Sequence, residues 1–250
     1  MRHRIFGLIG FPLGHSFSKK YFKDKFLSEN ITDADFLNFE LENPDDFLKL
    51  IEKNPQLEGL TVTIPYKSSF LPLMDEISDE VKEIGALNVV KIQRKRGNVK
   101  LFGYNTDIFG FEKFLLEHLQ THHKQALILG TGGSSKAVAY ILRKLEINYL
   151  FVSRNNSNDK TLLYNDLTKE LIQSHQLIIN TTPLGMFPNL DSCPNISYKY
   201  LMDKHFLFDL VYNPEQTLFM KKGIEQGATA CNGYDMLHYQ ADKAWEIWNS

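Results

Sequence analysis

The sequence predicts an α/β protein of two lobes with a cleft between them, and three observations support this. Short apolar runs alternate with stretches of helical periodicity along most of the 250 residues. This alternation stops and begins again near Gln125, which indicates two series. The second series opens with a glycine-rich turn between an apolar run and a helical stretch. Alternating strands and helices form parallel sheets with right-handed crossovers.

The first series predicts a sheet with helices packed on it. Three buried strands are expected at Arg4–Gly10, Asp35–Leu41 and Leu57–Ile64. Two helices are expected at Ser16–Asn30 and Pro44–Asn54, the second starting with Asn43 as cap and Pro44 at the first position. The runs LNVVKIQ and VKLFGY flank Gly97 and Asn98, which predicts an antiparallel hairpin.

The second series predicts a further sheet followed by a closing helix. Its expected elements are a strand over Gln125–Gly130, a helix over Gly133–Leu145, and strands over Ile147–Ser153, Gln176–Asn180 and His205–Val211. A final helix, roughly Tyr234–Trp248, is expected to pack back on the first lobe. We therefore expect one domain over residues 1–103 plus 233–250 and another over residues 104–232.

Composition excludes several classes of protein. Apolar content of 43% and charged content of 23% are typical of a globular chain. The net charge is −2, and the basic run Lys91–Lys100 is typical of a solvated hairpin, so nucleic-acid binding is disfavoured. Two cysteines give neither metal spacing nor a disulfide framework, and no apolar stretch could span a bilayer. We expect a cytoplasmic protein, without a metal and with His118, His122 and His123 solvated.

The glycine-rich turn LILGTGGSSKAV predicts a dinucleotide site of the Rossmann type. Its spacing is Gly130-x-Gly132-Gly133, with Ser135 at the usual third glycine position. Amides at a helix N-terminus bind pyrophosphate, and glycines allow the backbone to approach it; a plain tight turn is the alternative. The next strand ends in Ser153-Arg154, without the acid that NAD sites place there. A guanidinium suits a 2′-phosphate, which favours NADP over NAD.

Polar residues follow several other predicted strands. In the second lobe these segments are Asn180–Met186 and Asp209–Pro214. In the first lobe they are Gly10–Ser18, Thr61–Lys67, Gly85–Asn88 and Gly103–Asp107. Ligands bind at the carboxyl ends of strands in open α/β sheets. Helix capping by Ser16 and Asn105, and simple turns in the second lobe, are the alternative interpretations.

Taken together, these motifs resemble the shikimate dehydrogenase family, whose members reduce 3-dehydroshikimate to shikimate with NADPH. The similarity runs nearly end to end. It rests on the GxPxxHSxS pattern at Gly10–Ser18, TVTIPYK, GALN, NTD, the GxGG turn, NTTPLGM, and the GYDML pattern from Gly233 with Gln240 beyond it. The chain departs from the family pattern at Lys19, Tyr21, Phe22 and Thr61.

The resemblance implies a set of roles. Lys67 and Asp107 would be the catalytic pair, with the sequence leaving open which is the formal acid/base. Ser16 and Ser18 would bind the substrate carboxylate; Thr63, Asn88 and Gln240 would hold ring hydroxyls, and Tyr212 would line the substrate side. The cofactor would contact Gly130, Thr131, Gly132, Gly133, Ser134, Ser153, Arg154, Asn180, Thr181, Thr182, Met186 and Gly233.

Two other functions compete with this one, and both can be distinguished by sequence features. A quinate/shikimate dehydrogenase using NAD would favour an acid where Arg154 stands. A non-catalytic NADP-binding sensor on the same fold would dispense with Lys67 or Asp107, and both are present. We expect a monomer or homodimer that acts on a small molecule, with no nucleic-acid or membrane partner.

Overall fold

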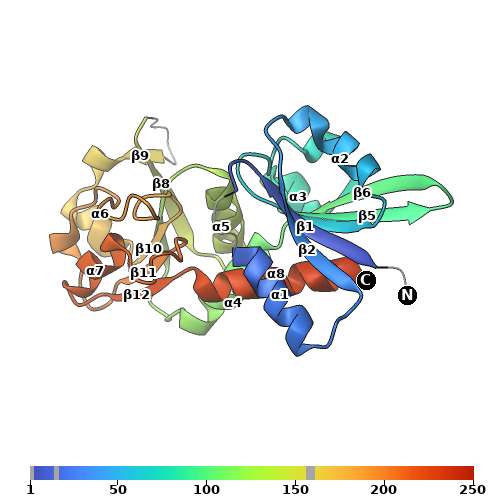
Figure 1. The fold of residues 1–250 in the computed structure, drawn as a ribbon. Helices are drawn as coiled ribbons and strands as arrows, with labels where there is room; N and C mark the ends of the chain where they lie inside the picture. Colours follow the sequence, from blue (N-terminus) through green and yellow to red (C-terminus); the bar gives the residue numbers. More distant parts are fainter. Residues whose placement is uncertain (1–2, 14–16, 156–160) are drawn as a thin grey trace. The chain divides into compact units, whose positions relative to one another are not determined.

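The computed structural model describes residues 3–13, 17–155 and 161–250 (Figure 1). The chain divides into two compact units. Unit 1 comprises Met1–Phe109 and His238–Ser250, and unit 2 comprises Gly110–Leu237. Each unit contains its own six-stranded sheet, so the predicted two-lobed α/β class is confirmed.

The sheet of unit 1 is mixed, with strand order β2-β1-β3-β5-β6-β4. Its strands are β1 (Arg4–Gly10), β2 (Ala34–Glu40), β3 (Leu57–Val62), β4 (Glu76–Ile77), β5 (Val89–Lys95) and β6 (Asn98–Tyr104). β1 pairs in parallel with β2 and β3, whereas β5 is antiparallel to β3 and β6. The predicted hairpin is confirmed, since Lys95 pairs with Asn98 across the turn.

The helices of unit 1 include the three that the sequence predicts and two short ones, η2 and α3, that it does not. They are α1 (Phe17–Ser28), η1 (Pro44–Asp46), α2 (Phe47–Lys53), η2 (Leu71–Leu73), α3 (Asp79–Ile84) and the greater part of α8 (Tyr234–Asn249). The single helix expected over Pro44–Asn54 is wrong in detail, because its first turn is a separate 3₁₀ helix. Asn43 caps that turn as predicted, its side chain accepting a hydrogen bond from the Asp45 amide.

The aromatic core of unit 1 explains why the C-terminal helix returns to this part of the chain. Trp248 is 5% exposed, stacks on Phe6 at 5.0 Å between ring centroids, and donates from Nε1 to the Val90 carbonyl. A Cβ added to Gly59 would lie 2.4 Å from the Trp248 ring, so glycine is required there. The prediction that the last helix packs on the first lobe is confirmed.

The sheet of unit 2 is parallel throughout, with strand order β12-β11-β10-β7-β8-β9. The strands are β7 (Gln125–Leu129), β8 (Asn148–Ser153), β9 (Thr161–Leu163), β10 (Leu177–Asn180), β11 (Phe206–Asp209) and β12 (Thr229–Asn232). The helices are α4 (Asp107–His118, which begins in unit 1), α5 (Gly133–Lys144), η3 (Tyr164–Asp166), α6 (Lys169–Ser174), η4 (Tyr198–Tyr200) and α7 (Leu218–Ile224). The predicted strands and helix of this series are confirmed.

Two predictions about solvated residues are wrong. Lys91, at one end of the basic run, is 8% exposed, and its Nζ donates to the Ser250 carbonyl and, at 3.0 Å, to the Ser250 hydroxyl. His123 is 3% exposed, with Nδ1 accepting from the Gln120 amide. Burial lowers the pKa of the His123 imidazole. Within the described part of the chain, no helix is both long and apolar enough to cross a membrane.

Candidate functional site

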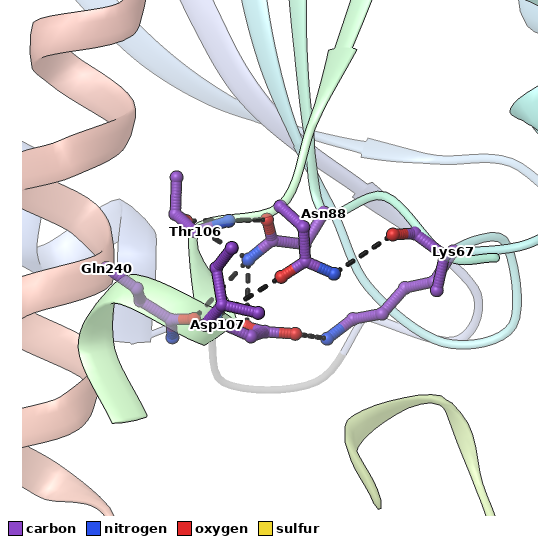
Figure 2. Close-up of polar contacts among 8 residues, drawn as sticks. Lys67, Asn88, Thr106, Asp107 and Gln240 are labelled. Atoms are coloured by element: carbon purple, nitrogen blue, oxygen red, sulfur yellow. Dashed lines mark hydrogen bonds and ion pairs between the residues drawn. The ribbon is translucent and has the colours of Figure 1, made fainter. Parts of the chain in front are cut away.

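An ion pair between Lys67 and Asp107 forms the chemical centre of unit 1 (Figure 2). Lys67 Nζ lies 2.6 Å from Asp107 Oδ2. The lysine side chain is 18% exposed and the aspartate side chain 8%, so the pair is largely shielded from solvent. Lys67 belongs to the segment after β3, and Asp107 is the first residue of α4. Asp107 therefore lies at a helix N-terminus, where the backbone dipole favours a negatively charged side chain.

Asn88 connects this pair to its surroundings (Figure 2). Its Nδ2 donates to Asp107 Oδ1 at 2.8 Å and to Thr106 Oγ1 at 3.1 Å, and reaches Gln240 Oε1 at 3.4 Å. Its Oδ1 accepts from the Thr106 amide at 2.6 Å. The Asp107 carboxylate is therefore held from two sides, by an ammonium on one oxygen and by an amide on the other.

The local chain geometry fixes these positions. Asn88 stands between α3 and β5, and its backbone amide bonds to the Tyr104 carbonyl of β6. Asn105 Oδ1 accepts from the Ile108 amide and Asn105 Nδ2 donates to the Ala86 carbonyl. The helix-cap interpretation of Asn105 is thus correct, and the cap also ties the start of α4 to the segment that carries Asn88.

Thr63 and Ser18, two other residues expected to bind substrate, take no part in this hydrogen-bonded network. Thr63 follows β3 and is half-buried; a Cβ added to Gly10 would lie 2.5 Å from its Cγ2. Ser18 is the second residue of α1 and is partly exposed. Ser16 lies outside the described residues. The network therefore joins Lys67, Asp107, Asn88 and Gln240 of the predicted set, and adds Thr106.

Thr106 is the member of the network that sequence reasoning missed. It is 2% exposed and bonds to both ends of the Asn88 side-chain amide. Its position inside the NTD motif, between Asn105 and Asp107, was the available signal. A threonine in such a tripeptide reads as an ordinary cap or turn residue, so the signal is weak.

The glycine-rich turn of unit 2 has the features that a dinucleotide requires. Gly130 has φ +109°, and an added Cβ there would lie 2.8 Å from Thr181 Oγ1. Gly132 is the N-cap residue of α5, and it has no side chain that could bond to the free amides of the first turn. A Cβ added to Gly132 would meet no protein atom within 4 Å. The turn therefore leaves the helix N-terminus accessible to a pyrophosphate. Ser135 at the third position is buried, its hydroxyl donating to the Gly132 carbonyl.

The remaining nucleotide candidates follow β7 and β8. Thr131 is exposed, whereas Gly133 and Ser134, the first residues of α5, are partly exposed. Ser153 ends β8, and the exposed Arg154 comes next. Burial raises the pKa of the Tyr164 phenol, and the nearby Arg154 guanidinium opposes that rise. A guanidinium at this strand end suits a 2′-phosphate, so these residues fit NADP.

The loop after β10 is fixed by a buried polar network. Asn180 is 0% exposed, and its Nδ2 donates to Asp209 Oδ1 at 2.9 Å. Its Oδ1 accepts from the amide and hydroxyl of Thr182. Thr181 Oγ1 donates to the Leu129 carbonyl at 2.7 Å. The sequence analysis assigns no role to Asp209, although an acid at the end of the apolar strand HFLFDLV is a signal for one.

The three remaining predicted ligand-binding residues of unit 2 lie in separate loops. Met186 is 45% exposed in the loop after β10. Tyr212 follows β11 and is half-buried, and burial raises the pKa of its phenol. Gly233 precedes α8 and is buried; an added Cβ would lie 2.5 Å from the Leu210 carbonyl oxygen, so glycine is required. Across residues 3–13, 17–155 and 161–250, no three His, Cys, Asp or Glu side chains gather as a metal site.

Comparison with protein families matches residues 8–90 to the shikimate dehydrogenase substrate binding domain. A curated relative, shikimate dehydrogenase (NADP(+)) of Clostridium beijerinckii, is 39% identical over 98% of this chain and 91% of its own length. The same name belongs to a relative from Methanococcus maripaludis that is 37% identical over 98% of this chain and 91% of its own length.

Solved structures agree with these matches. A chorismate mutase/shikimate 5-dehydrogenase fusion protein from Clostridium acetobutylicum superposes with a TM-score of 0.86 at 32% identity, covering 100% of this chain and 92% of that one. A shikimate dehydrogenase in complex with NADP+ gives a TM-score of 0.85 at 29% identity, covering 98% of this chain and 90% of that one.

Proposed function

The chain belongs to the shikimate dehydrogenase family, and on that premise we propose that it interconverts 3-dehydroshikimate and shikimate with NADP as its cofactor. The reaction is an oxidoreduction at a CH–OH group, in the pathway to the aromatic amino acids. The observation that carries the proposal is the 2.6 Å Lys67–Asp107 pair, supported through Asn88 and Gln240 in one network. Such an arrangement places a proton donor beside an oriented carboxylate.

The nicotinamide of NADP, when bound, supplies or accepts the hydride. Residues of unit 2 would hold the cofactor. The α5 N-terminus with Gly130, Gly132 and Gly133 would take the pyrophosphate, and Arg154 would grip the 2′-phosphate. Thr131, Ser134 and Ser153 would add polar contacts along the nucleotide. The loop Asn180–Thr182 with Met186, and Gly233, would lie beside the nicotinamide end.

We assign the proton transfer to Lys67. An ammonium has three N–H donors, and Lys67 gives one of them to Asp107 Oδ2. Another can donate to the carbonyl oxygen at C3 of the substrate, stabilising the negative charge that develops there and delivering the proton. Asp107 orients the ammonium, because its other oxygen is already held by Asn88.

The substrate would be held by polar side chains of unit 1. Ser16 and Ser18, around the start of α1, would bind its carboxylate, and Thr63, Asn88 and Gln240 would bond to ring hydroxyls. The role of Tyr212 in lining the substrate side stays a prediction. We further propose that residues 1–103 with 233–250 form the substrate domain and residues 104–232 the nucleotide domain. Action in the cytoplasm as a monomer or homodimer stays a prediction.

A steady-state assay with purified protein tests this function. Shikimate is offered with NADP⁺ or NAD⁺ in separate reactions, quinate replaces shikimate in a parallel pair, and reduced nicotinamide is followed. Turnover with shikimate and NADP⁺ well above the other three combinations is expected. Equal use of quinate or preference for NAD⁺ would assign the chain to a quinate/shikimate dehydrogenase, and binding of NADP⁺ without turnover would indicate a sensor.

A further inference from the structure

A fully buried carboxylate in unit 2 takes no part in the chemistry proposed above. Asp209, the last residue of β11, is 0% exposed. Its Oδ1 accepts from Asn180 Nδ2 at 2.9 Å and from the Val211 amide at 3.0 Å, and its Oδ2 accepts from Thr217 Oγ1 at 2.6 Å. All three partners are donors, so the site is built for the ionised acid.

The bond to Asn180 extends the influence of Asp209 into the loop after β10. Asn180 Oδ1 accepts from the Thr182 amide and from the Thr182 hydroxyl at 2.6 Å. The Thr182 hydroxyl in turn accepts from the Leu184 amide at 3.3 Å. One buried carboxylate therefore fixes the rotamer of Asn180, and through Asn180 the turn that continues to Leu184.

The two other bonds connect Asp209 to the segment after β11 and to the start of α7. Thr217 is 0% exposed and caps α7, its Oγ1 accepting from the Met220 amide. Gly185, with φ +87°, approaches Thr217 so closely that an added Cβ would lie 3.3 Å from the Thr217 Cβ. Asp209 thus joins three segments of unit 2, all at or beyond the carboxyl ends of parallel strands, where α/β sheets bind ligands.

Burying an ionised carboxylate is costly, and an apolar residue would fill the same space without that cost. Asp209 nevertheless lies at the carboxyl end of the parallel sheet, where ligands bind, which indicates a role for this carboxylate other than packing. We propose that Asp209 is a positioning residue for the cofactor: its carboxylate holds the Asn180–Leu184 loop in the arrangement that binds NADP. The inference rests on the proposed function, since it presumes that this loop contacts NADP.

The electrostatics of the site make the role sensitive to pH. Burial raises the pKa of Asp209 to about 6, although its three hydrogen bonds oppose the rise. Among the described residues, Tyr198 of η4 interacts electrostatically with Asp209, and burial raises the pKa of the Tyr198 phenol, so that phenol is neutral near pH 6. Lys222 of α7 lies over the Tyr198 ring and donates to Cys193 Sγ. Protonation removes the negative charge that strengthens the bonds from Asn180 Nδ2 and the Val211 amide, so support for the loop weakens as pH falls through about 6.

The test is the dissociation constant of NADP⁺, measured by titration calorimetry between pH 5 and pH 8 without substrate. Asp209→Asn preserves shape and removes the charge, and Asp203→Asn removes an exposed carboxylate of the same unit as a control. The 2′-phosphate of NADP⁺ also titrates near pH 6, so the readout is the ratio of variant to wild-type constants at each pH. Thermal unfolding confirms that each variant is folded.

We expect the Asp209→Asn ratio to be about 10 at pH 8, the scale of one hydrogen bond to a charged group. It should fall toward 1 at pH 5, where wild-type Asp209 is protonated, and kcat at saturating NADP⁺ should change little. Thr217→Val keeps the carboxylate but removes one donor. It should raise, by about one pH unit, the pH at which the curve of NADP⁺ dissociation constant against pH has its inflection. The Asp203→Asn ratio should stay near 1 throughout.

An Asp209→Asn ratio near 1 at pH 8, or one that does not vary with pH, would overturn the positioning role while leaving the dehydrogenase function intact. If Asp209→Asn does not fold, an unmoved inflection in Thr217→Val overturns it instead. Failure of the wild-type protein to bind NADP⁺ at any pH would overturn the proposed function itself, and this inference with it.

Discussion

Each unit of the molecule contains a shielded carboxylate, and the two are built differently. Asp107 in unit 1 pairs with Lys67, whose side chain is 18% exposed, and it accepts from Asn88 on its other oxygen. Asp209 in unit 2 is 0% exposed and accepts only from an amide side chain, a backbone amide and a hydroxyl. The first site joins a proton donor to a carboxylate, and the proposed proton transfer to the substrate rests on this arrangement. The second can only hold neighbouring groups in place.

We propose proton transfer for the first network and cofactor positioning for the second. On that proposal, substitutions in unit 1 and unit 2 should affect different kinetic quantities. Changes at Lys67 should lower turnover. Changes at the glycine-rich turn or at Arg154 should weaken the binding of NADP without altering the proton transfer.

The largest effect is expected at the lysine of the ion pair. Lys67→Ala should lower kcat for shikimate oxidation by ~10²- to 10⁴-fold, the scale of losing a general acid/base. Lys49→Ala, which removes an exposed lysine paired with Asp46, is the matched control and should leave kcat unchanged. The absorbance of NADPH, followed in stopped-flow or steady-state assays, measures kcat for both variants. Similar kcat values for the two variants would refute the assignment of Lys67.

Two glycines of the nucleotide turn should respond differently to the same added methyl group. Gly130→Ala places a Cβ 2.8 Å from Thr181 Oγ1 at φ +109°, so it should weaken NADP⁺ binding and lower the free energy of unfolding by about 1–3 kcal/mol. Gly132→Ala meets no protein atom within 4 Å. It should weaken NADP⁺ binding by about 10-fold, through crowding of the pyrophosphate, and leave stability nearly unchanged.

Calorimetric binding and denaturant unfolding distinguish these cases. Retained NADP⁺ affinity in Gly132→Ala would show that the pyrophosphate does not approach the α5 N-terminus. Equal losses of stability in both variants would contradict the steric account of Gly130.

Cofactor choice should depend on the guanidinium after β8. Arg154→Gln removes the bidentate partner of the 2′-phosphate. It should raise KM for NADP⁺ by about 10-fold, which is the scale of losing one hydrogen bond between charged groups. KM for NAD⁺ should stay within about twofold, because NAD⁺ has no phosphate there. Parallel saturation curves with the two cofactors measure the change, and an equal rise for both would assign Arg154 to a general structural role.

The smallest effect concerns stability and pH in unit 2. Burial lowers the pKa of His123 in the folded state, so folding favours the neutral ring. The stability contributed by keeping this ring neutral is present above the unfolded pKa of about 6.5 and is lost as pH falls below it. His123→Gln should therefore unfold with a smaller pH dependence than wild type between pH 7 and pH 5. Urea unfolding at several pH values tests this; identical slopes would contradict it.

The sequence predicted the parts of the fold in which local signals agree. β1, the β5–β6 hairpin, the β7–α5 turn and α8 each have strong periodicity or distinctive turn residues, and each formed within a few residues of its predicted bounds. The expected elements did not include β4, β9, β12 or the twelve-residue helix α4. Strands of two or three residues, such as β4 and β9, have no measurable periodicity and form only through pairing with a neighbour.

The candidate site was predictable in part. The motifs named Lys67, Asp107, Asn88 and Gln240, which the structure joins in one network. Thr106 and Asp209 were missed because their importance lies in burial and in partners distant along the chain. His123 shows the same limit, since a histidine in a polar run reads as solvated until tertiary packing covers it.

The most direct test of the division between the two networks is the NADP⁺ dissociation constant of Lys67→Ala, measured by titration calorimetry in the absence of substrate. If the proton-transfer network of unit 1 is independent of cofactor binding, this constant will equal the wild-type value within about twofold, while turnover falls by the ~10²- to 10⁴-fold given above. A loss of NADP⁺ affinity of about 10-fold or more would show that Lys67 acts through the cofactor site and would contradict the separation proposed here.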